Sequence, residues 1–575
     1  MTAIGFKPAA CAAPTLLFAA IGVSAAADSP PAMPTSGELA SACPGLAGAA
    51  VAASLPAART RITAAAVEAA TPTMPAHCRV DGEINRRIGI DGQPYAIRFR
   101  LRMPLAQWNA RFYMGGGGGT NGTLVDPVAR LGAGYATIGT DGGHDNSVNN
   151  VAAAGGTGAF GVDPQARIDF AYNAYDQVTQ VGKALVARFY TLPAKRAYFE
   201  GCSEGGREAL LMTQRFPEHY DGVVAGDPVL HLPLGPMSGV YTTQLFAGLA
   251  RRSGLAHADG TPAITRTYSD TDLMLLRQAV LGACDALDGL ADGIVDNLAA
   301  CTRPLVNAKL AAVQCKGAKT DACLSADQIG TMQKAFDGTL NSQGVQLYSD
   351  WQWDAGIGGL SGNTYNPAWR SWWLGAHASP HNNAIKLNYA TPLAVAYTTP
   401  PLLPIAVADS LAYSMAYDFD TQPIKLYTTS GLYTQSAAQL YFTDAVELRA
   451  FDRRGGKMMV YHGASDSAVS VNDTLRWYQA MSAQMGVGTQ DFARMFVVPG
   501  MAHCRGGPAT DSFDMLPQLV DWVENGVAPD AVLARASNPG YFGVAARSRP
   551  LCPYPRFSRY QGHGDINDAA SFSCR

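Results

Sequence analysis

Ser203 lies in a pentapeptide that could make it a nucleophile. The residues Gly201-Cys202-Ser203-Glu204-Gly205 form a Gly-x-Ser-x-Gly motif between an apolar segment typical of a strand and a segment with helical spacing. A strand, a tight turn and a helix in this order are the context of a nucleophile elbow, which exposes the serine hydroxyl above a sheet. The alternative is a chance match in a chain with 60 glycines, but the flanking pattern favours the elbow.

Two later residues could complete a catalytic triad with Ser203. α/β-Hydrolases carry the nucleophile, the acid and the histidine in this order along the chain. Asp466 and His503 follow in that order, each after an apolar segment typical of a strand. Asp466 would orient the imidazole, and His503 would accept the proton of Ser203. His462 is the competing histidine, but it precedes the acid, so a structural or pocket-lining role is the better interpretation.

An acyl-transfer reaction also needs two backbone N–H donors for its oxyanion. The residue after the nucleophile, Glu204, supplies one donor, at the start of a helix whose positive end favours an anion. The second should come from the five glycines at 115–119, because a backbone without Cβ atoms can approach a substrate closely. A phosphate-binding loop and a plain linker are the alternatives. A phosphate-binding loop needs Gly-Lys-Ser/Thr, and Thr120-Asn121 follows instead.

The acidic loop at residues 285–296 carries several carboxylates between glycines. Hard oxygen ligands on a loop suit Ca²⁺. Asp285, Asp288 and Asp292 would bind the ion through side chains, and Leu290 and Ile294 through carbonyl oxygens. The loop lacks the spacing and the closing glutamate of an EF-hand, so a different cage with a structural role is expected. The alternative is a solvated acidic turn.

The periodicity of apolar residues predicts strands that alternate with helices, which is typical of a parallel sheet with covering helices. Residues 229–446 break this rhythm. The sequence therefore predicts an α/β-hydrolase whose two parts, 28–228 and 447–575, are separated by a large inserted lid domain with the calcium site. The predicted strands are 95–103, 112–114, 135–140, 196–200, 222–226, 457–461 and 495–498, and the predicted helices are 168–190, 206–216, 473–485 and 511–525.

Composition excludes several classes of protein. The chain has 575 residues, 15% of them charged, and a formal net charge of −3. Without a basic excess, no nucleic-acid partner is expected, and the glycines and prolines show no collagen-like period. No organic cofactor is expected. The sequence does not give the oligomeric state, and a monomer is favoured.

The first 27 residues resemble a secretory signal peptide. Lys7 precedes an apolar run at 14–23, and an Ala-x-Ala site precedes Asp28. This run is too short to span a bilayer, and no later stretch reaches 18 uninterrupted apolar residues. The expectation is a secreted or periplasmic protein without a membrane anchor, cleaved near Ala27.

The cysteines agree with export. Cys11 lies in the leader, and an even number in the remaining exported chain predicts a disulfide framework. Sequence alone does not fix the connectivity. Ser203 and His503 must lie in hydrogen-bond reach in a working triad, so their neighbours Cys202 and Cys504 could pair. Proximity along the chain favours Cys284–Cys301, Cys315–Cys323 and Cys552–Cys574, and Cys43–Cys78 would then tie down the N-terminal segment.

Three motifs make the chain resemble the tannase/feruloyl esterase family. They are the segments 201–208, 284–289 and 499–504, and the resemblance extends over nearly the whole mature chain. It implies a lid, a calcium site, a disulfide beside the triad and the five pairings above. It also places the second oxyanion donor at Gly119 and implies that Trp372 and His462 line the substrate pocket.

Two positions depart from the pattern of the most similar family members. Lys386 stands where an arginine would grip a free carboxylate of the substrate, so the charge remains but the bidentate fork is lost. Val469 stands where an aromatic residue would line the pocket. The resemblance implies a serine esterase for which mono(2-hydroxyethyl) terephthalate is the leading substrate, and a feruloyl or gallate ester is the alternative. A calcium-stabilised binding protein without activity and a peptidase are the remaining readings.

Overall fold

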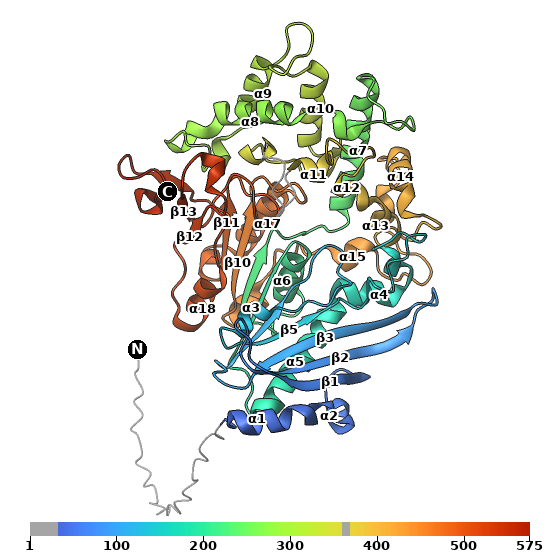
Figure 1. Ribbon diagram of the computed structural model, residues 1–575, viewed down its shortest axis with the longest axis vertical. Coiled ribbons are helices and arrows are strands. Elements are labelled where there is room, and N and C mark those ends of the chain that lie inside the picture. Colours follow the sequence, from blue (N-terminus) through green and yellow to red (C-terminus); the bar gives the residue numbers. More distant parts are fainter. Residues whose placement is uncertain (1–32, 359–368) are drawn as a thin grey trace, which may run out of the picture.

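The structure is a computed structural model that describes residues 33–358 and 369–575 (Figure 1). At its centre lies a nine-stranded sheet with the order β1-β2-β3-β5-β4-β6-β7-β10-β11. The proposed signal peptide, residues 1–27, lies outside the described residues. The strands of the sheet are β1 Thr60–Glu68, β2 His77–Ile88, β3 Pro94–Pro104, β4 Arg111–Gly115, β5 Ala136–Thr140, β6 Arg196–Cys202, β7 Gly222–Gly226, β10 Lys457–Gly463 and β11 Ala493–Val498.

The sheet is mixed rather than purely parallel. Strands β5, β4, β6, β7, β10 and β11 run parallel to one another, as their alternation with helices predicts. Strands β1, β2 and β3 add an antiparallel extension at one edge, and β3 pairs antiparallel with β5. Alternation in β3 buries Ile97, Phe99 and Leu101 on one face. The parallel part brings the carboxyl ends of its strands to one edge, where α/β proteins bind ligands.

Helices cover both faces of the sheet. The predicted helix 168–190 is divided, because a π-helical turn at Asp169–Asn173 separates α4 from α5. The helices outside residues 229–446 are α1 Ser36–Ala42, α2 Ala49–Ala53, α3 Val128–Leu131, α4 Pro164–Ile168, α5 Ala174–Tyr190, α6 Glu204–Gln214, α16 Arg449–Arg453, α17 Val471–Met485 and α18 Leu516–Asn525.

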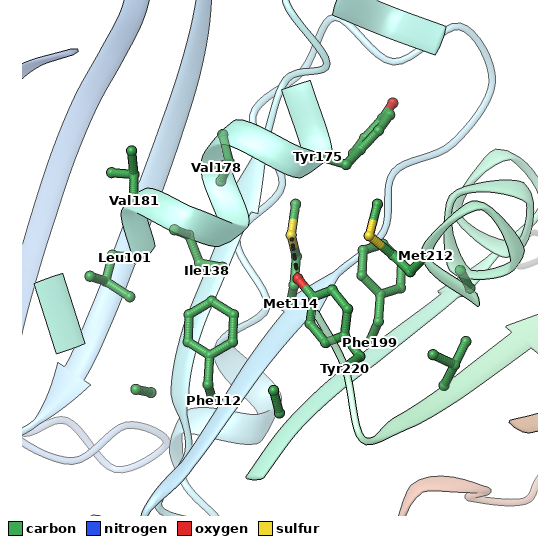
Figure 2. Close-up of a cluster of buried hydrophobic side chains, with 14 of the residues drawn as sticks. Leu101, Phe112, Met114, Ile138, Tyr175, Val178, Val181, Phe199, Met212 and Tyr220 are labelled. Atoms are coloured by element: carbon green, nitrogen blue, oxygen red, sulfur yellow. Dashed lines mark hydrogen bonds between the residues drawn. The ribbon is translucent and has the colours of Figure 1, made fainter. Parts of the chain in front are cut away.

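The main core lies between the sheet and helices α5 and α6. Figure 2 shows Val178 and Val181 of α5 facing Ile138 and Phe112 of the strands. These side chains are fully buried, and burying each large apolar side chain stabilises the fold by about 1.5–3 kcal/mol. The core fixes β6 and α6 relative to each other, and Ser203 lies between these two elements.

Residues 229–446, termed the inserted region, form a largely helical body beyond the carboxyl edge of the sheet (Figure 1). Its entry and exit segments lie side by side, because the Thr443 N–H donates to the Leu230 carbonyl (2.9 Å). Buried Trp351, Trp353 and Trp373 belong to its apolar core. Its helices are α7 Leu234–Arg252, α8 Asp270–Cys284, α9 Arg303–Ala312, α10 Ala326–Phe336, α11 Trp369–Trp373, α12 Ile385–Asn388, α13 Ala390–Val395, α14 Ser410–Ala416 and α15 Ala437–Tyr441.

Five disulfides stabilise the described chain. They include the long-range bridge Cys202–Cys504, whose Cα atoms lie 6.0 Å apart across 302 residues of sequence. No helix in the described ranges has the length and apolar character needed to cross a membrane. The other bridges are Cys43–Cys78, Cys284–Cys301, Cys315–Cys323 and Cys552–Cys574, so all five pairings match those that the family resemblance implies.

Candidate active site

Ser203 lies in the sharp turn between β6 and α6. Its backbone has φ +65° and ψ −122°, a conformation that costs a non-glycine residue free energy and that recurs at functional sites. The turn needs the flanking glycines, because a Cβ on Gly201 would lie 2.5 Å from the Gly205 carbonyl oxygen, and one on Gly205 would lie 2.7 Å from that of Gly117. This local geometry is the elbow that the pentapeptide predicts.

The structure brings Ser203, His503 and Asp466 together. The Ser203 hydroxyl lies 2.8 Å from His503 Nε2, and His503 Nδ1 lies 2.7 Å from Asp466 Oδ2. The other oxygen of Asp466 accepts the backbone N–H groups of Ala468 (2.7 Å) and Val469 (3.0 Å). The carboxylate is therefore fixed on both sides and orients the imidazole toward the hydroxyl.

Electrostatics around the three side chains suit a general base. Burial disfavours the ionised form of Asp466, but His503 and His462 outweigh it and hold the pKa of this carboxyl well below its usual range. Burial also disfavours the charged imidazole of His503, but Asp466 outweighs it and raises the pKa of His503. An ionised Asp466 thus stabilises the imidazolium that forms when His503 takes a proton.

The glycine loop is anchored to helix α6 beside Ser203. Glu208 accepts the N–H of Gly117 (3.0 Å) and the side-chain amide of Asn121 (2.8 Å), and Asn121 accepts the N–H of Gly118 (2.8 Å). These bonds hold Gly119, at φ +62°, at the wall of the cavity that contains Ser203. Glu204, the other predicted oxyanion donor, is the first residue of α6.

A cavity of about 60 Å³ opens at Ser203. Trp372 and Val469, both predicted to contact substrate, line it, and the Trp372 ring lies edge-on to the His503 ring with 5.4 Å between centroids. Tyr389 also lines it, and no sequence motif marks this residue. The remaining lining residues are mostly apolar: Gly119, Val229, Leu232, Gly235, Pro236, Lys386 and Ala468, with Ser203 and His503.

Lys386 lies in the wall of this cavity. Its Nζ is 4.0 Å from the ring centroid of Trp351 and 4.1 Å from that of Trp373. It has no hydrogen-bond partner among the described residues, and the side chain is buried. Burial therefore lowers the pKa of Lys386 well below its usual range, although the negative charge of Asp466 opposes this. An anionic group that entered the cavity would be a suitable partner for its ammonium form.

His462 does not line the cavity, in contrast to what the resemblance implies. It is fully buried behind Asp466, with Nε2 3.3 Å from Asp466 Oδ2 and Nδ1 2.9 Å from the Thr474 hydroxyl. The reason is its place inside β10, four residues before the acid, which directs its side chain into the protein.

The acidic loop lies in the inserted region and is closed by Cys284–Cys301. Its three aspartates accept backbone N–H groups within the loop, such as Leu290 N–H to Asp288 (3.0 Å) and Ile294 N–H to Asp292 (3.1 Å). Asp285 accepts the N–H of Asp292 (3.1 Å). Burial, with the charges of Asp292 and Asp285, raises the pKa of Asp288 to about 6. The ligand atoms that the loop offers are oxygens, the donor type that Ca²⁺ takes, and Arg547 and Arg549 also contact Asp292.

Among the described residues, two groups of potential metal ligands converge to within 4.8 Å: Cys202 with Asp227 and Cys504, and Asp227 with Asp466 and His503. The two cysteines form a disulfide, so their sulfur atoms are not thiolate ligands. The second group contains Asp466 and His503, which already bond to each other. Asp227 belongs to both groups, and it lies outside the motifs of the sequence.

The chain is similar to several known esterases. The family model "Tannase and feruloyl esterase" matches residues 78–575. The mono(2-hydroxyethyl) terephthalate hydrolase of Piscinibacter sakaiensis is 53% identical over 528 residues, which cover 89% of this chain and 87% of that protein. A probable feruloyl esterase B-1 of Aspergillus fumigatus is 28% identical and covers 82% and 81%.

Solved structures show the same fold. Feruloyl esterase B from Aspergillus oryzae matches with a TM-score of 0.69 and 24% identity, covering 93% of this chain and 100% of that one. The tannin acyl hydrolase from Aspergillus niger matches with a TM-score of 0.65 and 20% identity, covering 95% and 96%. The predicted α/β-hydrolase fold is thus confirmed, and the chain belongs to the tannase and feruloyl esterase family.

Proposed function

We propose that this protein is a serine carboxylic ester hydrolase, with Ser203 as nucleophile, His503 as general base and Asp466 as the acid that orients it. The observation that carries the proposal is the unbroken chain of short hydrogen bonds from Ser203 through His503 to Asp466 beside a mainly apolar cavity. A binding protein without activity has no need of such an arrangement in a strained turn.

The reaction would proceed through an acyl-enzyme. Ser203 attacks the ester carbonyl while its proton passes to His503, which then protonates the departing alcohol. His503 next removes a proton from water, and the resulting attack releases the acid and restores Ser203. The backbone N–H groups of Gly119 and Glu204 would stabilise the negative oxygen in both steps, a contribution of about 2.7–4 kcal/mol for each such donor.

The substrate class we propose is the monoester of an aromatic dicarboxylic acid, with mono(2-hydroxyethyl) terephthalate as the leading candidate. It would yield terephthalate and ethylene glycol. The apolar wall, including Trp372 and Val469, suits an aromatic ring, and the ammonium form of Lys386 would pair with a free carboxylate. The relative at 53% identity is named for this activity. The feruloyl esterase and tannin acyl hydrolase structures are 24% identical or less and support the fold alone.

Feruloyl or gallate esters remain the second candidate, because their neutral phenolic rings need no partner for Lys386. The deciding experiment compares kcat/KM for mono(2-hydroxyethyl) terephthalate, methyl ferulate and methyl gallate under one condition. We expect the terephthalate monoester to be preferred by at least tenfold. A preference for either phenolic ester would overturn the substrate assignment and leave the esterase assignment in place.

We propose that residues 229–446 act as a lid domain between the two hydrolase parts, 28–228 and 447–575. Trp372, Lys386 and Tyr389 come from this region, and Ser203 and His503 come from the hydrolase parts. Substrate choice would thus be set by the insertion, and the chemistry by the strand ends of the sheet.

We also propose that Asp285, Asp288 and Asp292, with the carbonyl oxygens of Leu290 and Ile294, hold a structural Ca²⁺. The donor set fits, because every ligand atom is a hard oxygen on one disulfide-closed loop, and a divalent cation would offset the repulsion between its carboxylates. No step of ester hydrolysis is assigned to the ion, since these residues are not among those that line the cavity at Ser203.

Removal of this ion should lower the melting temperature while changing the activity little below the transition. A ligand bound by the folded state alone stabilises it by about 2.7 kcal/mol at a hundredfold excess over Kd. Calorimetry after exhaustive chelation, with Ca²⁺ or Mg²⁺ added back, would measure this. The variant Asp288→Asn should melt lower and respond less to chelation, and an unchanged melting curve of the parent would refute the site.

Export is the proposed localisation. Five disulfides fit an oxidising compartment, and residues 1–27 have the sequence of a cleavable leader. We therefore propose a secreted or periplasmic enzyme. For its oligomeric state, we propose a monomer.

A further inference from the structure

Asp227 is a second buried carboxylate at the edge of the sheet that carries the candidate triad. It directly follows β7 and adopts φ +38°, an unusual backbone conformation for a residue with a Cβ. Its backbone N–H donates to the Tyr461 carbonyl (2.8 Å), and its Oδ1 accepts the N–H of Gly463 (3.0 Å). These bonds fix the carboxyl at the junction of β7 and β10.

The Asp227 carboxyl faces the groups of the triad. Its oxygen, one of Asp466 and a ring nitrogen of His503 all lie within 4.8 Å of one another. His462 Nε2 lies 3.8 Å from Asp227 Oδ1 and 3.3 Å from Asp466 Oδ2. Asp227, Asp466 and His462 are each at most 4% exposed, and His503 is 9% exposed.

Two further neighbours of Asp227 in the described part of the chain, Cys202 and Tyr461, carry no charge. Cys202 Sγ of β6 lies 3.6 Å from Asp227 Oδ2, but this sulfur belongs to the disulfide with Cys504. Burial and the charge of Asp227 raise the pKa of Tyr461 of β10 well above its usual range, so its phenol stays neutral. The charge of Asp227 must therefore be balanced within the group of two carboxyls and two imidazoles.

The number of protons shared by the two carboxyls and two imidazoles indicates a second ionisable site beside the Asp466–His503 pair. His503 must be neutral at Nε2 to accept the proton of Ser203, and Asp466 must be ionised to orient it. A further uncompensated carboxylate in the same buried space would be costly. One additional proton therefore resides in the group, either on the Asp227 carboxyl or on His462.

We propose that Asp227 is a positioning residue, which together with His462 holds a second proton beside the Asp466–His503 pair and thereby controls how strongly Asp466 stabilises the His503 imidazolium. The inference rests on the proposed triad. Asp227 contacts neither substrate nor the Ser203 hydroxyl in this scheme, and acts through its charge on the Asp466–His503 pair.

The pH at which this proton leaves lies near neutrality. Burial and the charge of Asp466 raise the pKa of Asp227 to about 7, although the imidazoles of His462 and His503 oppose this. Above that pH the ionised Asp227 adds negative charge near His503 and raises its pKa. The imidazolium formed during catalysis is then stabilised more, so kcat/KM should rise through two ionisations rather than one.

The variant Asp227→Asn tests this directly, because asparagine keeps the shape and the acceptor for Gly463 but cannot ionise. At pH 6 its kcat/KM should lie within about threefold of the parent, since the parent's Asp227 is then mostly protonated and, like asparagine, carries no charge. At pH 9 it should be about tenfold lower, and its profile should show one ionisation. His462→Gln should move the second ionisation of the parent to higher pH, because His462 lowers the pKa of Asp227.

Asp169→Asn is the matched control. Asp169 is another buried carboxyl, bonded to Gln165 and Asn173 in the π-helical turn, and this variant should retain the two-ionisation profile. An Asp227→Asn profile identical to that of the parent would overturn the proposal. If Ser203→Ala abolishes activity while Asp227→Asn changes nothing, this inference fails and the proposed triad stands.

A measurement on the parent protein avoids dependence on any variant. The proton on His503 Nδ1, bonded to Asp466, should give a strongly downfield NMR signal. Titration of that signal should show two inflections, one for His503 and one for the second proton. A single inflection between pH 5 and pH 9 would overturn the proposal.

Discussion

Replacing Ser203 with alanine should reduce ester hydrolysis by about 10⁴- to 10⁶-fold. The variant lacks the only atom that can form the acyl-enzyme, and what remains is the activity that binding and the oxyanion donors supply. The Ser203 hydroxyl bonds to His503, so its removal should change the melting temperature by only a few degrees. Steady-state kinetics on a p-nitrophenyl ester and calorimetry on the same preparation measure both quantities.

Ser238→Ala is the matched control for this substitution. Ser238 is buried, lies in α7, and its hydroxyl has no hydrogen-bond partner among the described residues. This variant should keep full activity. A serine-directed phosphonate should label the peptide that contains Ser203 in the parent and in Ser238→Ala. Activity of Ser203→Ala within tenfold of the parent, or labelling elsewhere, would place the nucleophile at another residue.

Replacing Lys386 with methionine should abolish the preference for a terephthalate monoester over a neutral ester. A charge-assisted hydrogen bond contributes about 1.5–3 kcal/mol, which is a roughly tenfold to hundredfold preference. Methionine keeps the apolar stem between Trp351 and Trp373, so the loss reports on charge rather than on a cavity. Lys386→Arg should keep or increase the preference, because its fork can bind two carboxylate oxygens.

The same lysine predicts a pH dependence that differs between substrates. Burial lowers the pKa of Lys386, so rising pH removes the charge that a carboxylate needs. KM for the monoester should therefore rise with pH, while KM for the neutral ester should not, and Lys386→Met should remove this difference. Equal losses on both esters, or none on either, would exclude Lys386 from substrate binding and favour the phenolic esters.

The sequence by itself determined those features that depend on local patterns. The elbow is predictable because its tight turn leaves no room for a Cβ at Gly201 or Gly205, and both glycines lie within the same five residues as Ser203. Asp466 and His503 are predictable because each follows a recognisable strand, in the order that the fold requires. Cystine pairing over short spans is similarly local. Even the pair Cys202–Cys504, 302 residues apart, could be inferred, because each cysteine adjoins a residue that the chemistry must bring together.

The tertiary structure alone decided what depends on packing between distant elements. Asp227 follows β7 in a segment without a motif, and it meets Asp466 and His503 only because β7 and β10 are neighbours in the sheet. His462 was expected in the pocket, but its position in β10 buries it behind Asp466. The surroundings of Lys386 are likewise formed by Trp351 and Trp373 of other segments. Side-chain environments of this kind arise from strand order and helix packing, which bring together residues that no spacing along the chain relates.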